Sequence, residues 1–194
     1  MKTFKYIRWL ILLCLLPYLF GCAAAAVGGA GAVAASTAYD RRTTGTQIED
    51  QTIEVKAAKA FHEDKELSDQ AHLNVTSYNT VVLVSGETPT DAMRQRAIEL
   101  VKAVDKVSHV YNEVTIAAPS SLVSRSSDSY ITSKVKTKMI TDKQLNGLQV
   151  KVVTEKGVVY LMGLVSHKEA EVATNIARET GGVQKVVKLF QYTD

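Results

Sequence analysis

The sequence predicts an α+β protein made of two tandem copies of one small module, each a three-stranded mixed sheet packed on two helices (α-β-β-α-β). Two observations carry this prediction. A nearly constant offset relates residues 46–117 to residues 128–194. Within each copy, the spacing of apolar residues also changes between helical and strand periodicity in the same order.

The N-terminal segment, residues 1–21, has the layout of a lipoprotein signal peptide. Lys2, Lys5 and Arg8 precede an apolar run over residues 9–20, and Cys22 follows Gly21. This run is shorter than the roughly 20 apolar residues of a membrane-spanning helix. An uncleaved signal anchor is the alternative interpretation. Residues 19–22 resemble the bacterial lipobox, which implies lipidation of Cys22. The alanine after Cys22 implies sorting to the outer membrane.

Two segments without apolar periodicity flank the first module. Residues 22–45 are rich in alanine, glycine and threonine, which predicts a flexible tether from the lipidated Cys22 with a reach of roughly 25 Å. Residues 118–127 are rich in serine and predict a linker between the modules.

Charge and cysteine content narrow the function classes. The formal net charge of +3 comes from Lys2, Lys5 and Arg8, so the chain after the leader is neutral and gives no support to nucleic acid as a partner. Cys14 lies within the leader, which leaves Cys22 as the one thiol of the processed chain and excludes an intramolecular disulfide.

The internal repeat extends over the whole of each module. The offset is 78 residues at the start, 77 in the middle and 76 at the end. It aligns residues of the same chemical type, among them the pairs Asp50 and Asp128, Ile53 and Ile131, Lys56 and Lys134, Gly86 and Gly163, and Val110 and Val186.

The second copy shows the expected elements most clearly. Apolar residues spaced by four predict a helix over residues 128–140, and a hairpin follows over residues 148–162 with its turn at residues 155–157. Ser166 and Glu169 form a capping-box pattern that opens a helix ending at Gly181. Residues 183–190 predict a last strand parallel to the strand before that helix. We also expect Gly86 and Gly163 to serve a tight bend at the end of a strand.

These motifs resemble the BON domain, a periplasmic module that often occurs in pairs. The resemblance rests on the strand and glycine at residues 84–86 and 161–163, on the alanine-spaced helix, and on the closing segments at residues 107–110 and 182–186. The whole chain resembles the DolP (formerly YraP) family of outer-membrane lipoproteins with two BON domains. That resemblance implies anionic phospholipids as partners of the second module, a place at the outer membrane and the division site, and a role in envelope integrity.

The charge of the two copies differs in the direction that this implication requires. Residues 46–117 hold 7 basic and 12 acidic residues, whereas residues 118–194 hold 11 basic and 7 acidic residues. The first helix of the second copy carries an aromatic ring and three lysines where the first copy has Thr52, Lys56, Ala60 and Ala58. Tyrosine favours the headgroup boundary, and lysine is attracted to an anionic leaflet. The candidate lipid-binding residues are Tyr130, Ile131, Lys134, Lys136 and Lys138.

A solvated helix face is the simpler interpretation of these lysines, and Tyr130 could instead pack on the first module. A second functional hypothesis is an adaptor, in which the acidic first copy and the sheet edges hold a protein of outer-membrane assembly or cell-wall remodelling. In that case the acyl anchor makes the only lipid contact. Because each module is small, we expect the two to dock on one another.

The sequence predicts no enzyme, no cofactor and no metal site. The four histidines, His62, His72, His109 and His167, lie at scattered points of the repeat without the spacing of metal ligands. The nucleophile-elbow and zinc-protease motifs are absent from the sequence.

Overall fold

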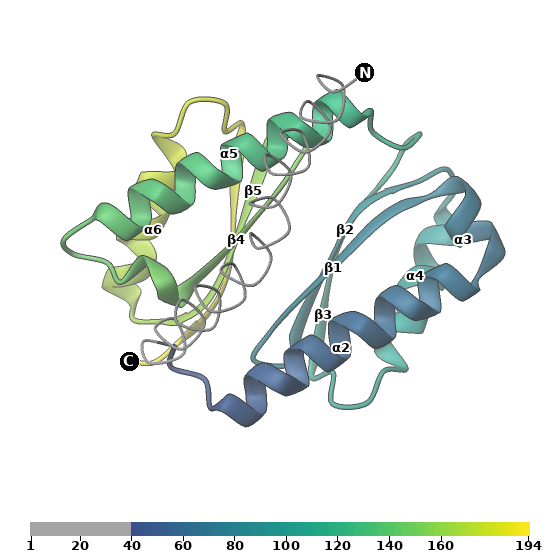
Figure 1. The fold of residues 1–194 in the computed structure, drawn as a ribbon, viewed down its shortest axis with the longest axis horizontal. Helices are drawn as coiled ribbons and strands as arrows, with labels where there is room; N and C mark the ends of the chain where they lie inside the picture. The colour runs from purple at the N-terminus through teal and green to yellow at the C-terminus, as the bar shows by residue number, and fades with distance from the viewer. Residues whose placement is uncertain (1–39) are drawn as a thin grey trace, which may run out of the picture. The chain divides into compact units, whose positions relative to one another are not determined.

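A computed structural model of the chain describes residues 40–194, and it contains both expected modules (Figure 1). The signal peptide, Cys22 and most of the expected tether lie outside the described residues. The first module consists of α2 (Thr44–Glu63), α3 (Lys65–Gln70), β1 (His72–Tyr78), β2 (Val81–Thr88), α4 (Asp91–Lys102) and β3 (His109–Ile116). The second consists of α5 (Leu122–Thr141), the 3-10 turn η1 (Gly147–Gln149), β4 (Val150–Glu155), β5 (Val158–Val165), α6 (His167–Arg178) and β6 (Lys185–Tyr192).

Each module has one three-stranded mixed sheet, which confirms the predicted fold class. The orders are β1-β2-β3 and β4-β5-β6. The first two strands of each sheet pair antiparallel through a tight hairpin, and the last strand pairs parallel because a helix carries the chain back across the sheet. Ser166 and Glu169 form the predicted capping box at the start of α6, with both reciprocal hydrogen bonds present.

Two helices begin earlier than the sequence predicts. Helix α5 begins at Leu122, inside the expected linker at residues 118–127, because the Ser121 side chain accepts a hydrogen bond from the Ser124 backbone N–H. Helix α2 begins at Thr44, inside the expected tether, where Thr43 caps the Thr46 N–H. The serines that suggested a loop lie in the first turns of α5, where they serve as a cap or bond to helix carbonyls.

The two aligned glycines serve a different purpose from the expected bend. Gly86 and Gly163 lie within β2 and β5 rather than at a turn. A side chain at Gly86, which has a φ of 118°, would overlap the carbonyl of His72, and a Cβ at Gly163 would lie 2.7 Å from the Gln149 carbonyl oxygen. Both positions therefore need glycine because the chain that enters the neighbouring strand passes too close for a Cβ.

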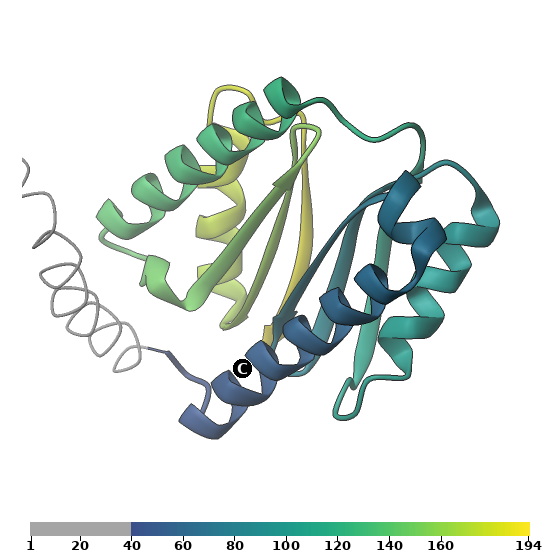
Figure 2. The same cartoon turned by 45° about the vertical axis from the view of Figure 1, so that its right-hand side comes forward.

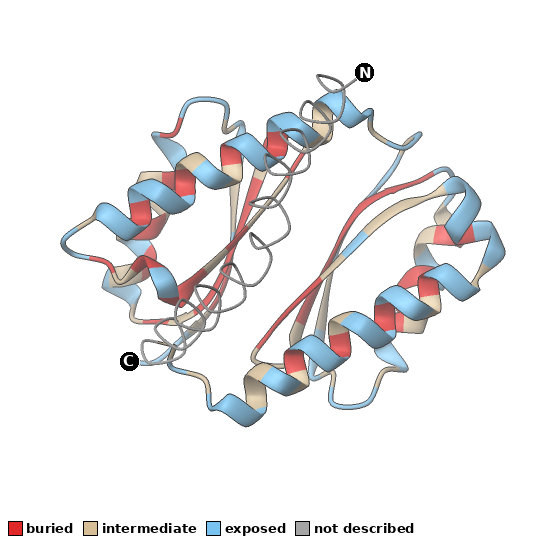
Figure 3. Cartoon of the chain, in the orientation of Figure 1, coloured by how far each residue is buried: buried red, intermediate tan, exposed pale blue. Residues whose placement is uncertain are grey.

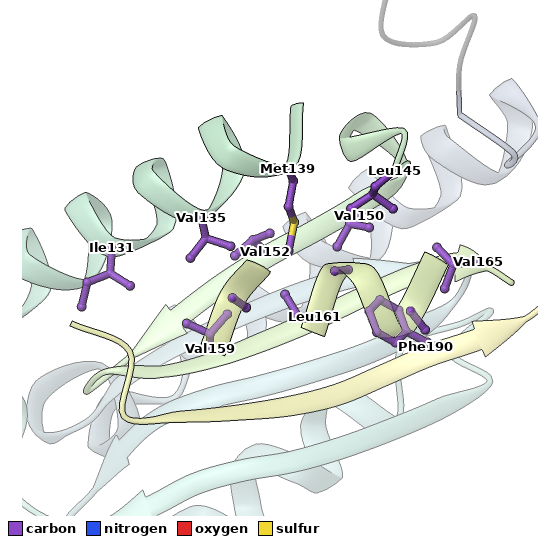
Figure 4. Close-up of a cluster of buried hydrophobic side chains, with 13 residues drawn as sticks. Ile131, Val135, Met139, Leu145, Val150, Val152, Val159, Leu161, Val165 and Phe190 are labelled. Carbon is purple, nitrogen blue, oxygen red and sulfur yellow. The ribbon is translucent and has the colours of Figure 1, made fainter. Parts of the chain in front are cut away.

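Both faces of each sheet are buried (Figures 2 and 3). One face packs on the helices of its own module; in the second module α5 contributes Ile131, Val135 and Met139 to this core (Figure 4). The opposite faces pack on each other through a shared cluster of Tyr78 and Leu83 from the first module and Tyr160, Met162 and Leu189 from the second. The two modules thus dock as predicted. Double-sided burial also explains why β2 and β5 read as nearly continuous apolar runs.

A buried aspartate on the first helix of each module fixes the hairpin beneath it. Asp50 accepts hydrogen bonds from the backbone N–H groups of Asn79 and Thr80, at 2.7 and 2.8 Å. Asp128 does the same for Lys156 and Gly157, both at 2.9 Å. All four turn residues have positive φ, as a two-residue hairpin that follows the strand twist requires. This conformation is strained for a β-branched residue such as Thr80, so the carboxylate holds the turn in place.

Replacing Asp50 by alanine is expected to destabilise the protein by about 3 kcal/mol, because it leaves two turn N–H groups and the Ser77 hydroxyl without their acceptor. It also removes one of the two carboxylates that pair with Arg42. Urea unfolding monitored by circular dichroism measures the change. Asp105→Ala is the control, since this carboxylate is 83 % exposed, and should alter stability little. Equal effects of the two substitutions would contradict this role of Asp50.

Leu83→Arg is expected to separate the modules, since it places a charge between the two sheets where Leu83 is fully buried. The ¹⁵N relaxation rates of the two halves should then report independent tumbling, while amide shifts near Ile131 and Val135 stay in place. Val55→Arg, at a residue 68 % exposed on α2, is the control and should leave the halves tumbling together. Joint tumbling in the Leu83 variant would show that this cluster does not hold the modules together.

Candidate membrane-contact surface

Helix α5 has a buried face that places one predicted lipid-binding residue in the core. Ile131 is 6 % exposed and packs with Val135 and Met139 over the sheet. It also abuts Gly182, where an added Cβ would lie 3.0 Å from Ile131 Cγ1. The prediction that Ile131 contacts lipid is therefore wrong: its spacing of four from Val135 marks the core-facing stripe of the helix.

The outer face of α5 brings three of the predicted residues together. Tyr130, Lys134 and Lys138 are spaced by four residues and therefore lie in one row along the helix. Tyr130 is 66 % exposed, and the Lys134 Nζ lies 5.2 Å from the centre of its ring, within cation–π range. The row thus combines an exposed aromatic ring with two ammonium groups.

Both lysines of this row have backbone partners at the end of α6. Lys134 Nζ donates to the Gly181 carbonyl at 2.6 Å, and Lys138 Nζ donates to the Glu179 carbonyl at 3.2 Å. Cations at a helix C-terminus satisfy free carbonyls and favour the negative end of the helix dipole. Within residues 40–194, neither lysine forms an ion pair with a carboxylate. The two positive charges are therefore held in place without being neutralised.

The matching position of the first module is neutralised. Lys56, which aligns with Lys134, forms an ion pair with Asp105 at 3.2 Å. At the offset of 76 residues that relates this part of the repeat, Asp105 aligns with Gly181. The same lysine thus contacts a carboxylate in one module and an uncharged carbonyl in the other, so only the second module presents a net positive charge here.

Lys136 lies apart from the row of Tyr130, Lys134 and Lys138. It is two positions from Lys134 and therefore lies on another side of the helix. Its side chain is exposed, but the surrounding protein partly removes water from the ammonium group and Lys151 adds a like charge, and both lower the pKa of Lys136. Lys136 is a weaker candidate for contact with a flat surface that touches Tyr130.

The sequence prediction missed two exposed apolar residues at the start of α5. Val123 is 79 % exposed and lies seven residues before Tyr130, which places it on the same side of the helix, and the adjacent Leu122 is 76 % exposed. Both fall in the segment interpreted as a linker. The capping pattern of Ser121 followed by two apolar residues is the signal that could have found them. We call Leu122, Val123, Tyr130, Lys134 and Lys138 together the α5 surface.

The helices of residues 40–194 do not include one with both the length and the apolar character needed to cross a membrane.

Comparison with known proteins supports the two-module architecture. The family model of the BON domain matches residues 49–118 and 127–194. The chain is 43 % identical over 177 residues to the outer membrane lipoprotein DolP of Haemophilus influenzae, and the match covers 91 % of each chain. It is 35 % identical over 153 residues to the 21 kDa hemolysin of Actinobacillus pleuropneumoniae, covering 79 % of each. It is also 31 % identical over 138 residues to the osmotically-inducible protein Y of Escherichia coli, covering 70 % of this chain and 67 % of that protein.

None of these three relatives is named as an enzyme. With two BON modules, and with 43 % identity to an outer membrane lipoprotein over 91 % of its length, the chain belongs to the family of dual BON-domain outer-membrane lipoproteins.

Proposed function

We propose that the second module binds anionic phospholipids, phosphatidylglycerol and cardiolipin, through the α5 surface, and that this contact supports the integrity of the outer membrane. The observation that carries the proposal is the pair of ammonium groups on Lys134 and Lys138, which no carboxylate of residues 40–194 neutralises, beside the exposed ring of Tyr130.

The α5 surface has the chemical layout of a peripheral lipid contact. Each lysine near an anionic leaflet contributes about 1 kcal/mol of attraction. The Tyr130 ring can enter the apolar zone while its hydroxyl stays at the headgroups, and Val123 adds apolar area on the same helix face with Leu122 next to it. The sum is a weak contact, so an acyl anchor on Cys22 would raise its occupancy by keeping the module near the bilayer.

The first module is poorly suited to the same contact. Its net charge of −5 over residues 46–117 would be repelled by an anionic surface, and Lys56 is already paired with Asp105. Docking of the modules therefore combines a lipid-facing half with a half that stays in the aqueous periplasm. A role at the division site rests on the family resemblance alone.

The adaptor hypothesis has one observation in its favour. Ile48 and Val55 on α2 of the acidic module are 61 % and 68 % exposed and, seven residues apart, lie on one face of the helix. A protein partner with a complementary apolar and basic surface could dock there. In that case, lipid contact would come only from the acyl anchor and would not depend on α5.

Flotation with liposomes distinguishes the two functions. Residues 40–194, which form one compact unit, should float with vesicles that contain phosphatidylglycerol or cardiolipin and not with phosphatidylcholine alone. The Lys134→Glu and Lys138→Glu double variant should lower the partition coefficient by about 30-fold or more, as expected from losing two lysines. Lys56→Glu, at the aligned position of the first module, is the matched control and should float like the unchanged protein. Unchanged flotation of the double variant would favour the adaptor.

Salt separates the two parts of the proposed contact. Raising the ionic strength from about 0.1 to about 1 M shortens the screening length from about 10 to about 3 Å, so binding of the unchanged protein should fall sharply. Tyr130→Ala should weaken binding at both salt concentrations, because its apolar contribution is not screened. Vesicle sedimentation measures the partition coefficient of each protein at the low and at the high salt concentration. Binding that does not respond to salt would argue against an electrostatic contact with headgroups.

A further inference from the structure

A histidine and two glutamates meet at one end of the interface between the modules. His72 and Glu87 are partners in the antiparallel pairing of β1 with β2 and therefore point to the same side of that sheet. That side faces the second module. Side chains an even number of residues apart on a strand share a face, so His72 lies on the face of Tyr78 and Glu87 on the face of Leu83, and both Tyr78 and Leu83 pack on the second module. Glu155 ends β4 of the second module. One ligand atom from each of the three side chains lies within 4.8 Å of the other two.

The two carboxylates are buried, which is unusual without strong compensation. Glu87 is 0 % exposed and Glu155 is 7 % exposed. Asn74 Nδ2 donates to Glu155 Oε2 at 3.0 Å, and the Ser120 N–H donates to Glu87 Oε2 at 3.2 Å. Each bond is made to the Oε2 atom of its carboxylate. The Oε1 atoms, which also need hydrogen-bond or ionic partners when they are buried, take no part in these two bonds.

Glu87 Oε1 has one ion-pair partner, Lys156, and no well-aligned hydrogen-bond donor among the described residues. Lys156 Nζ lies 2.9 Å away, close enough for an ion pair, yet this fully buried oxygen accepts no hydrogen bond from any described residue. The Lys156 side chain is 39 % exposed, so its ammonium group can turn towards water. The neighbouring Asp128 adds a third carboxylate, while Arg125 is the other cation beside the cluster. Three carboxylates thus face two cations here.

The His72 ring is placed as an acceptor. Asn74 Nδ2 approaches its Nε2 at 3.3 Å and Arg125 Nη1 approaches its Nδ1 at 3.4 Å. A neutral imidazole carries one N–H, so both donors cannot be satisfied together, and both contacts are long. Such a ring has a lone pair for which the surrounding protein provides only a weak partner.

We propose that His72, Glu87 and Glu155 bind one divalent transition-metal ion, with Zn²⁺ the best fit, and that this ion joins the two modules. One imidazole nitrogen and two carboxylate oxygens form a three-ligand zinc set that leaves a fourth position for water. In a tetrahedral zinc site the ligand atoms lie about 3.3 Å apart, so the three ligand atoms, which lie within 4.8 Å of one another, need to approach by at most roughly 1.5 Å. A pocket of about 520 Å³, lined by His72, Asn74, Arg125, Asp128 and Glu155 among others, gives the ion and its water a route from solvent.

The sequence spacing could not predict this site, because its ligands come from three strands in two modules. The ion would replace the Lys156 ammonium at Glu87 Oε1, so lysine and metal compete for the same oxygen. Removal of the lysine should therefore strengthen metal binding, an effect that is not expected if the cluster is only an ion pair.

Calorimetric titration of ZnCl₂ into the metal-stripped full-length protein in detergent tests the proposal. One ion should bind per chain and raise the thermal midpoint. Glu155→Gln and His72→Asn should each weaken zinc binding by about tenfold or more. His109→Asn, at an exposed histidine of the same module, is the matched control and should bind like the unchanged protein. Lys156→Met should bind zinc more tightly, since the competing cation is removed.

Thermal unfolding of each variant without metal shows which variants are folded, and circular dichroism at the start of each scan confirms it. The absence of saturable zinc binding to the unchanged protein would overturn the proposal. So would zinc affinities of the folded Glu155 and His72 variants within twofold of the unchanged protein, or weaker binding by the folded Lys156 variant.

Discussion

The contact between a helix carboxylate and a hairpin turn is the interaction on which each module depends. Asp50 and Asp128 are almost fully buried, and each accepts two successive backbone N–H groups of a turn whose residues have positive φ. The contact fixes the turn, and the turn sets the register of the two strands that leave it. Because the aspartate lies on the core-facing side of the first helix, the same contact also sets where that helix crosses the sheet.

Once the register is fixed, the alternation of each central strand decides how the modules meet. In β2, Val82 and Val84 face the helices of their own module, whereas Leu83 faces the other sheet. The second module repeats this arrangement in β5, with Leu161 inward and Tyr160 and Met162 towards the first module. With both faces of both sheets covered, the outer faces of the helices and the sheet edges remain as surfaces for other molecules. The α5 surface is one of these faces.

The sequence was most informative where one local pattern determines one local structure. The Ser166 and Glu169 capping box, the hairpin turn at Lys156 and Gly157, and the parallel last strand all follow from short segments. The sequence was less informative where one helix carries both core residues and surface residues. Ile131 belongs to the core although its neighbour Tyr130 is exposed, and only the phase of the helix separates them. The start of α5 was not predicted because the segment around it is rich in serine, which is common both in loops and at helix caps.

The cluster of His72, Glu87 and Glu155 has no signal along the chain, because strand pairing and module docking bring its residues together.

The comparison of the two copies shows how one duplicated module can acquire two surface chemistries without a change of fold. Lys56 and Lys134 both reach from the first helix of their module to the loop that follows α4 or α6, the helix before the last strand. Asp105 receives the first lysine and the Gly181 carbonyl receives the second, so the position of the ammonium group is preserved. A carbonyl oxygen carries only part of a negative charge, however. Lys134 therefore keeps most of the positive electrostatic potential that it produces at the surface. Exchanging a carboxylate for a backbone acceptor thus leaves the packing of the helices intact and changes only what the surface attracts.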